Sequence, residues 1–343
     1  MRFSIDLISW YKKHKRDLPW RKTKDAYTIW LSEIILQQTR VDQGLSYFYK
    51  FVENYPTIND LAKAPEEDVL KHWQGLGYYS RAKNLHYTAK HIVANYNGIF
   101  PNNHKDILAL KGVGEYTAAA ISSFSFNQPY PVIDGNVYRV LSRVFGVKQA
   151  IDSTQGKKTF KALAEELIDK KNPATYNQAI MEFGALQCTP KIPNCSNCIF
   201  SLECFALKHN LITELPKKEK RIKQTTRYFN YLVLIDEDFT YLKERTTKDI
   251  WQGLFDFPLI ETNQTINSSK SLLKELAIKD ISVINKSAAV KHILSHQKIY
   301  ATFWEIKPSE QITNNPNYTK VKLKEINNYP VPKLIENYIK TMV

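Results

Sequence analysis

The chain has 343 residues, enough for two domains, and apolar residues at 43% can fill ordinary hydrophobic cores. Forty-eight Lys and Arg residues against 34 Asp and Glu leave a formal charge of +14, which favours a polyanionic partner, nucleic acid before membrane. No run of about 18 apolar residues occurs, and the N-terminus lacks the apolar core of a signal peptide. These features predict an intracellular protein without a membrane span, in a compartment where thiols stay reduced.

Two helical patterns begin the chain. Apolar side chains recur at helical spacing over residues 3–16. The following segment contains Arg16, Trp20 and Arg21 around a proline, and these side chains either clamp a base or pin a loop. Asp25 is the expected N-cap of a helix from Ala26 to Gln38. That helix is apolar nearly all round and is therefore predicted to be buried.

Glu33 is the single acidic residue in this second helix, and burying a carboxylate is costly. It either faces solvent or is desolvated with a raised pKa. Gln38 and Thr39 follow at the helix end, where uncharged hydrogen-bonding side chains could meet base edges. Further along, Leu76 and Tyr78 lie in a glycine-rich aromatic turn, where they either pack locally or enter a base stack.

A glycine pair, Gly112 and Gly114, separates two helical patterns at 106–110 and 116–124. A tight turn between helices needs a positive φ, which glycine adopts readily. The bare backbone also lets another molecule approach, and the next helix N-terminus can bind a phosphate. A plain helix–turn–helix packing element is the alternative. Asp134 follows, as the expected N-cap of an amphipathic helix.

The hairpin together with Asp134 resembles the helix–hairpin–helix of the endonuclease III superfamily of base-excision DNA glycosylases. Residues 30–39, Trp-Leu-Ser-Glu-Ile-Ile-Leu-Gln-Gln-Thr, are similar to the glutamate-bearing motif of MutY-type adenine DNA glycosylases. This resemblance implies that Glu33 and Asp134 are the two catalytic carboxylates. It also implies that Tyr116 and Asn136 orient them.

The same resemblance implies which residues meet the extruded base or the DNA. They are Arg16, Trp20, Arg21, Leu36, Gln38, Thr39, Leu76, Tyr78, Gly112, Gly114 and Gln178. Bifunctional members carry a nucleophilic lysine after the hairpin, where this chain has Tyr116. Tyr138 stands where some relatives have another lysine. The resemblance therefore implies a monofunctional glycosylase, which leaves an abasic site without cutting the strand.

All four cysteines, Cys188, Cys195, Cys198 and Cys204, fall within 17 residues. In an intracellular protein such clustering argues for a metal site over disulfides, and thiolates suit zinc or an iron–sulfur cluster. Zinc sites usually contain two C-x2-C pairs, whereas this segment contains one. The C-x6-C-x2-C-x5-C spacing is similar to the loop of the endonuclease III family, which implies a [4Fe–4S] cluster with a structural role.

The residue pattern of the sequence changes after Tyr228, beyond a basic stretch that starts at residue 208. We expect a helical glycosylase domain over 1–207, with the iron–sulfur loop at 188–204, then a linker over 208–227 and a mixed α/β domain over 228–343. The linker carries seven basic residues against two acidic ones, so it is either a solvated tether or a phosphate contact. The fold class expected for the whole chain is thus α plus α/β.

Regular structure in the last domain follows from strand and helix periodicity. Strands are predicted at 231–235, 241–243 and 299–306, and a short helix at 271–277.

Two stretches of this domain resemble the Nudix-like domain of MutY-type enzymes. One is residues 251–258, and the other is Leu294-Ser295-His296, where the family usually has Phe-Ser-His. The resemblance implies that Ser295 and His296 recognise the lesion base. A Nudix hydrolase also needs an acidic magnesium box, but the corresponding helix offers only Lys274-Glu275-Leu276, so no nucleotide hydrolysis is expected.

The resemblance covers essentially the whole chain. It implies removal of adenine opposite 8-oxoguanine or guanine in double-stranded DNA, by base flipping and hydrolysis of the N-glycosidic bond, by a cytoplasmic, nucleoid-associated monomer. Three other functions would share some of these features: a thymine- or oxidised-pyrimidine-specific relative, a non-catalytic DNA-binding module and a nucleotide pyrophosphohydrolase. Both carboxylate motifs, Tyr116 and the missing acidic box argue against them.

Overall fold

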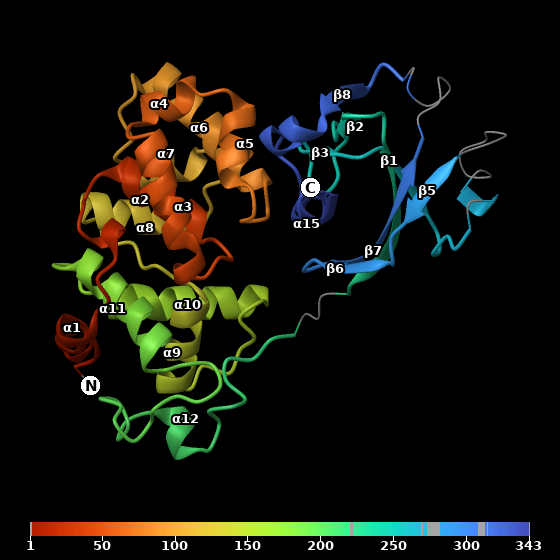
Figure 1. Cartoon of the computed structure of the whole chain (residues 1–343). Helices are drawn as coiled ribbons and strands as arrows, with labels where there is room; N and C mark the ends of the chain where they lie inside the picture. The colour runs from red at the N-terminus through yellow and green to blue at the C-terminus, as the bar shows by residue number, and fades with distance from the viewer. Residues whose placement is uncertain are drawn as a thin grey trace. The chain divides into compact units, whose positions relative to one another are not determined.

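The structure is a computed structural model that describes residues 2–219, 223–268, 270–272, 282–307, 313 and 315–342 (Figure 1). Packing divides the chain into two compact units. Unit 1 comprises Met1–Lys63 and Asn84–Arg221, and unit 2 comprises Ala64–Lys83 and Ile222–Val343. No helix among the described residues is both long and apolar enough to cross a membrane.

Unit 1 is helical throughout its described part. Its elements are α1 (Phe3–His14), the 3-10 turn η1 (Pro19–Arg21), α2 (Ala26–Leu36), α3 (Val41–Asn54), α4 (Ile58–Lys63), most of α6 (Ser80–Tyr96), α7 (His104–Ala109), α8 (Glu115–Phe126), α9 (Gly135–Phe145), α10 (Thr154–Leu167), α11 (Pro173–Leu186) and α12 (Phe205–Lys208). Asp25 caps α2 as predicted, because its side chain accepts a hydrogen bond from the Thr28 N–H. The helix ends at Leu36, before the predicted Gln38, since Gln38 has a φ of 55°.

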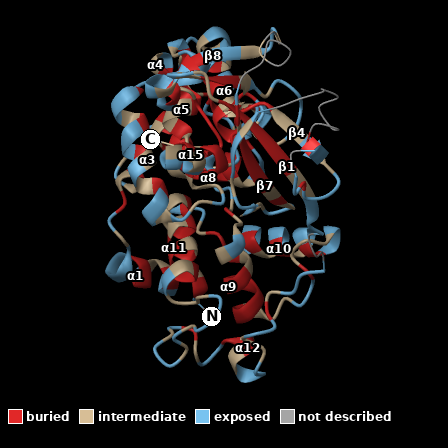
Figure 2. Cartoon of the chain, turned by 45° about the vertical axis from the view of Figure 1, so that its right-hand side comes forward, coloured by how far each residue is buried: buried red, intermediate tan, exposed pale blue. Residues whose placement is uncertain are grey.

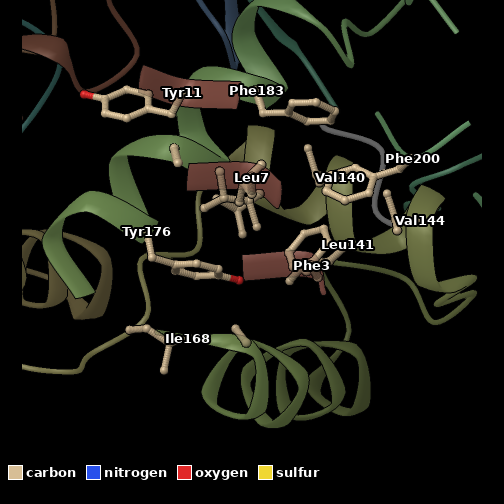
Figure 3. Packing of buried hydrophobic residues seen from close by; sticks show 14 of the residues in the cluster. Phe3, Leu7, Tyr11, Val140, Leu141, Val144, Ile168, Tyr176, Phe183 and Phe200 are labelled. Atoms are coloured by element: carbon tan, nitrogen blue, oxygen red, sulfur yellow. The ribbon is translucent and has the colours of Figure 1, made fainter. Parts of the chain in front are cut away.

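One large core of unit 1 lies between α1, α9 and α11 (Figure 3). Phe3 stacks on Phe200 with ring centroids 4.8 Å apart, and Trp10 meets the edge of Phe183 at 5.0 Å. Figure 2 marks buried residues in red on both α9 and α11. Each fully buried aromatic or aliphatic side chain contributes about 1.5–3 kcal/mol, so this core fixes the two helices that carry much of the candidate site.

The turn between α7 and α8 uses its two glycines differently. Gly112 has a φ of 82°, and a Cβ there would lie 2.7 Å from the Cβ of Asn84, so both conformation and space require glycine. Gly114 has a φ of −97°, and a Cβ built on it would meet nothing within 4 Å. The protein itself therefore does not require glycine at position 114, and the backbone there stays open to another molecule.

Unit 2 contains two sheets. Its elements are α5 (Glu66–Trp73), β1 (Thr225–Leu234), β2 (Phe239–Glu244), β3 (Phe255–Asp256), β4 (Leu259–Thr262), β5 (Val283–Lys286), β6 (Val290–Ile293), β7 (Gln297–Ile306), β8 (Tyr318–Lys322), the 3-10 turn η2 (Leu323–Asn328) and α15 (Lys333–Met342). One sheet has the order β4-β1-β7-β5, with β6 also paired to β7, and the other has the order β3-β2-β8. The three predicted strands are confirmed as β1, β2 and β7, each longer than expected.

Strands β1 and β7 run parallel, from Thr225 opposite Gln297 to Leu234 opposite Ile306. Helix α15 covers one face of this sheet, where Tyr338 stacks on Phe303 with centroids 3.8 Å apart. The predicted helix at 271–277 lies outside the described residues from position 273 onward. Lys274-Glu275-Leu276 and the linker residues Lys220 and Arg221 likewise lie outside them.

Candidate active site

A cavity of about 800 Å³ in unit 1 gathers most of the predicted site residues. It is bounded by α2, η1, the start of α3, α8, the segment before α9, and α11. The predicted residues that line it are Arg16, Trp20, Arg21, Glu33, Leu36, Thr39, Tyr116, Asp134, Asn136 and Gln178. Segments more than 160 residues apart in sequence therefore form one site.

Glu33 lies on the buried helix α2 and is only 6% exposed, so of its two possible placements the desolvated one is found. The Tyr116 hydroxyl donates a hydrogen bond to Glu33 Oε2 at 2.8 Å. Burial raises the pKa of Glu33 to about 7, against the opposing effect of that hydrogen bond. Burial also raises the pKa of Tyr116 well above its usual value, so the phenol remains a donor. Glu33 can therefore carry a proton near neutral pH.

Asp134 caps α9, as predicted from the sequence. Its Oδ1 accepts from the Val137 N–H at 2.8 Å, and its Oδ2 accepts from Asn136 Nδ2 at 2.8 Å. Burial raises the pKa of Asp134, while these two hydrogen bonds act in the opposite direction. Arg139 donates to Asn136 Oδ1 at 2.8 Å, which turns the amide N–H toward Asp134. The carboxylate is thus held by donors that favour its ionised form.

A buried ion-pair cluster lies at the wall of the cavity. Glu182 accepts from the Arg16 N–H and Nε at 2.9 Å, from Arg16 Nη2 at 2.8 Å, and from Arg21 Nη2 at 2.7 Å. Burial alone would raise the pKa of Glu182, but these bonds hold it down to about 2. Arg21 Nη1 is buried and has no hydrogen-bond partner among the described residues. It is a free donor in the wall of a cavity.

Among the other predicted residues, Trp20 and Gln178 make contacts within the protein, whereas Gln38 does not face the cavity. Trp20 is buried and packs edge-on against Phe48, with centroids 5.2 Å apart. Gln178 accepts from the Tyr11 hydroxyl at 2.7 Å. Gln38 is exposed and is not among the residues that line the cavity.

Some residues that line the cavity had no predicted role. Arg40 and Asp42 stand at the start of α3, and Glu182 lies on α11, the helix predicted to carry Gln178. The one local signal was the four-residue spacing between Gln178 and Glu182, which places both on one side of a helix.

Four predicted DNA-contacting residues belong to unit 2. Leu76 is 7% exposed, so in this conformation it is packed inside the protein and does not point outward. Tyr78 is 41% exposed and has a φ of 48°. Ser295 and His296 are exposed in the turn between β6 and β7. The Tyr78 and Ser295 hydroxyls share a hydrogen bond, so two of the four residues lie together.

The four cysteines are free thiols that line one small cavity. Among the described residues, no three His, Cys, Asp or Glu side chains converge closely enough to hold a single metal ion. In an iron–sulfur cube each thiolate binds its own iron, so the sulfurs need not converge on one point. The buried Arg143 braces the loop by donating to Thr189 O at 2.7 Å and Pro190 O at 2.9 Å, with Nη1 3.5 Å from Cys188 Sγ. The donor set therefore fits a cluster better than a single ion.

Two carboxylates in one cavity large enough for a base, beside a helix–hairpin–helix, define a class of protein: the DNA glycosylases that act on extruded bases. Comparisons with known proteins agree with this class. Residues 31–169 match the HhH-GPD superfamily of base excision DNA repair proteins, and residues 230–341 match the NUDIX domain.

Relatives identify the family within this class. The chain is 35% identical to an adenine DNA glycosylase of Buchnera aphidicola from Acyrthosiphon pisum, across 99% of this chain and 98% of that protein. It is 42% identical to the human adenine DNA glycosylase across 60% of this chain and 39% of the human one. The chain therefore belongs to the adenine DNA glycosylase family, enzymes that hydrolyse N-glycosyl bonds.

Two solved structures have folds similar to part of this chain. A thermostable thymine-DNA glycosylase is 31% identical, with a TM-score of 0.57 over 60% of this chain and 95% of that one. A non-covalent endonuclease III–DNA complex is 21% identical, with a TM-score of 0.53 over 62% of this chain and 98% of that one. The second likeness concerns the fold alone.

Proposed function

We propose that this protein removes adenine mispaired with 8-oxoguanine or guanine in duplex DNA, and that it leaves the strand uncut. The observation that carries this proposal is the pair Glu33 and Asp134 in one cavity, with different hydrogen-bond donors around each. Two groups whose surroundings differ in this way can divide the roles of acid and anion. The relatives named adenine DNA glycosylase supply the base to be removed.

The first chemical step is departure of the base. Adenine is extruded from the duplex into the cavity, where protonated Glu33 donates its proton to a ring nitrogen and makes adenine a better leaving group. Arg21 Nη1, the free donor in the cavity wall, can meet an acceptor on the base. As the bond breaks, positive charge develops on the sugar, and the Asp134 carboxylate stabilises it.

The second step is hydrolysis. Glu33, now a carboxylate, accepts a proton from water as the water adds to the sugar carbon. Asn136 keeps Asp134 facing the sugar, and Tyr116 keeps Glu33 in place, as their hydrogen bonds suggest. Tyr116 is a protonated phenol that already donates to Glu33, so it offers no amine for a Schiff base. The product is an abasic site in an intact strand.

We also propose that Cys188, Cys195, Cys198 and Cys204 hold a [4Fe–4S] cluster. Their shared cavity, their free thiols and the bracing by Arg143 support this. When bound, the cluster would tie residues 188–204 into one rigid loop. No step of the base removal passes through it.

DNA is held, in this proposal, at several points of the chain. Gly114 leaves an open backbone at the N-terminus of α8, a site suited to a phosphate. Tyr78 has an exposed aromatic side chain that is available to enter the base stack. The division into a glycosylase domain at 1–207, a linker at 208–227 and a Nudix-like domain at 228–343 remains a prediction, as do the cytoplasmic location and the monomeric state.

Lesion recognition is assigned to Ser295 and His296. Adenine is a normal base, so its removal is useful only when the partner base is wrong. 8-Oxoguanine differs from guanine by an oxygen at C8 and a hydrogen at N7, which a hydroxyl and an imidazole can distinguish. A good hydrogen-bond pair is worth roughly 1–3 kcal/mol of discrimination, so the double variant Ser295→Ala/His296→Ala should lose about tenfold to a hundredfold of preference for 8-oxoguanine over guanine.

The test measures release of free base in single turnovers from duplexes that each carry one mismatch. Adenine should be released opposite 8-oxoguanine and guanine, while thymine opposite guanine should not. Glu33→Gln and Asp134→Asn should each abolish release, whereas the exposed control Glu166→Gln should match wild type. Release of thymine but not adenine would contradict the proposal, and normal release by either carboxylate variant would remove that residue from the mechanism.

A further inference from the structure

We propose that one face of the β6–β7 hairpin, with the adjoining part of β1, binds the phosphates of the DNA strand whose base Ser295 and His296 recognise. This phosphate-binding face is formed by Lys291, Lys298, Tyr228 and Tyr300. The inference rests on the proposed role of the hairpin tip, and it adds the strand contact that such recognition requires. Phosphate contacts set the register of a protein on DNA, while base contacts carry the specificity.

Strand pairing places these side chains together. Lys291 lies opposite Tyr300, Tyr300 lies opposite Tyr228, and Ile293 lies opposite Lys298. Paired residues of neighbouring strands project to the same side of a sheet, and alternate residues along a strand share a side. The rings of Tyr228 and Tyr300 stack, with centroids 5.6 Å apart and planes 18° from parallel. Two lysines and two phenols therefore share one side of the sheet.

This side of the sheet is open at the hairpin end. Farther along the same strands, Leu232, Trp304 and Ile306 on this side are buried in a hydrophobic cluster. At the hairpin end Lys291 is exposed, and Lys298, Tyr228 and Tyr300 are half-buried. The opposite side of the sheet is core, with Phe229, Ala301 and Phe303 buried. A partner thus has access to a short stretch that directly adjoins the tip.

The charge of this face suits a polyanion. Among the described residues, neither Lys291 nor Lys298 forms an ion pair. The acids of the neighbouring segments, Glu261 and Asp249, are bound by Arg227 at 2.6 and 2.8 Å. Arg227 lies opposite Ile299, on the core side, so these carboxylates do not neutralise the two lysines. Lysine ammonium groups and phenol hydroxyls are the donors that phosphate oxygens accept.

The position of this phosphate-binding face beside the hairpin turn indicates that a DNA backbone binds there. The Leu294 N–H donates to Gln297 O at 2.8 Å and closes the hairpin, so Ser295 and His296 occupy its turn. A base that reaches this turn brings its own backbone with it. The adjoining lysines, one on each strand of the hairpin, are placed to receive that backbone.

The experiment uses the full chain and a duplex with 8-oxoguanine opposite 2′-fluoro-2′-deoxyadenosine, whose glycosidic bond resists cleavage. Affinity is measured by fluorescence anisotropy over a series of KCl concentrations. Each phosphate contact contributes about 0.9 to the slope of log affinity against log salt, so Lys291→Gln/Lys298→Gln should reduce the slope by about 1.8. The matched control Lys322→Gln/Lys324→Gln removes the same charge from exposed positions of β8 and η2 and should leave the slope unchanged.

Two further arms separate the possible outcomes. Lys291→Arg/Lys298→Arg keeps the charge and should keep the wild-type slope, which distinguishes phosphate binding from loss of fold. Ser295→Ala/His296→Ala should change the preference between 8-oxoguanine and guanine but not the slope, so failure of the proposed function is seen separately. A slope for the glutamine pair equal to that of the control pair would overturn the inference. For the glutamine pair, a changed base preference with an unchanged slope would overturn it as well.

Discussion

The hydrogen bond between Tyr116 and Glu33 leads to a quantitative prediction about pH. In the proposed mechanism Glu33 must be protonated to act as the acid, and its pKa of about 7 places the expected loss of activity near pH 7. The Tyr116 hydroxyl donates to Glu33 Oε2 at 2.8 Å and favours the carboxylate form. Tyr116→Phe removes that donor while keeping the ring, so the pKa of Glu33 should rise and activity should persist to higher pH.

The size of the shift follows from the hydrogen bond. A bond to a charged group contributes about 1.5–3 kcal/mol, and one pKa unit corresponds to about 1.36 kcal/mol. The shift should therefore be roughly one to two units. It should be close to the full value because Glu33 is buried, so little water can replace the lost donor.

The assay is the single-turnover rate of adenine release between pH 5 and 10, on a duplex with adenine opposite 8-oxoguanine. Wild type should lose activity above about pH 7, and Tyr116→Phe should lose it one to two units higher. Glu33→Gln, measured in parallel, should be inactive throughout. An alkaline limb at the same pH in wild type and Tyr116→Phe would show that Glu33 is not the group that titrates.

Four other experiments have expected outcomes. Because the pKa of Glu33 is raised from 4.5 to about 7, its contribution to stability is complete below pH 4.5 and is lost as the pH rises through 7. Glu33→Gln should therefore unfold with a free energy about 3 kcal/mol above wild type at pH 8 but not at pH 4 in urea titrations. Glu182→Gln removes the counter-charge of Arg21, whose side chain is only 14% exposed, which should cost up to about 3 kcal/mol in the same titrations. Purified protein should contain about four irons per chain, and Cys198→Ser should lower that content; a single zinc would refute the cluster. Borohydride should trap little covalent adduct, since Tyr116 offers no amine, and efficient trapping would contradict the monofunctional assignment.

Local signals were sufficient to predict the elements that carry the two acids. Asp25 and Asp134 each precede an apolar helical pattern, and each accepts a hydrogen bond from the N–H three residues later. Such caps depend on a few adjacent residues. For the same reason the turn at Gly112 could be read from sequence, whereas Gly114 does not have the positive φ that a tight turn suggested for the pair.

Contacts between residues far apart in the sequence could not be predicted from such local patterns. The Glu182 cluster joins residues 161 and 166 positions apart, and no periodicity in either segment indicates which arginine an acid on α11 will meet. Leu76 is a similar case, because only the packing of unit 2 shows that this side chain is buried while Tyr78 is exposed. The direction that a side chain takes in a turn depends on what packs beside it.

The difference between the two acids arises at the level of the fold. An isolated glutamate and aspartate have nearly the same pKa, and burial raises the pKa of both here. Glu33 projects from the middle of a helix, where the backbone N–H groups are already engaged within the helix, so a single phenol is its hydrogen-bond donor. Asp134 stands at a helix N-terminus, where free N–H groups and the positive end of the dipole favour a carboxylate. Placing one acid within a helix and the other at the start of a helix thus gives the cavity two carboxyl groups in different hydrogen-bond environments, which is what the proposed division into acid and anion requires.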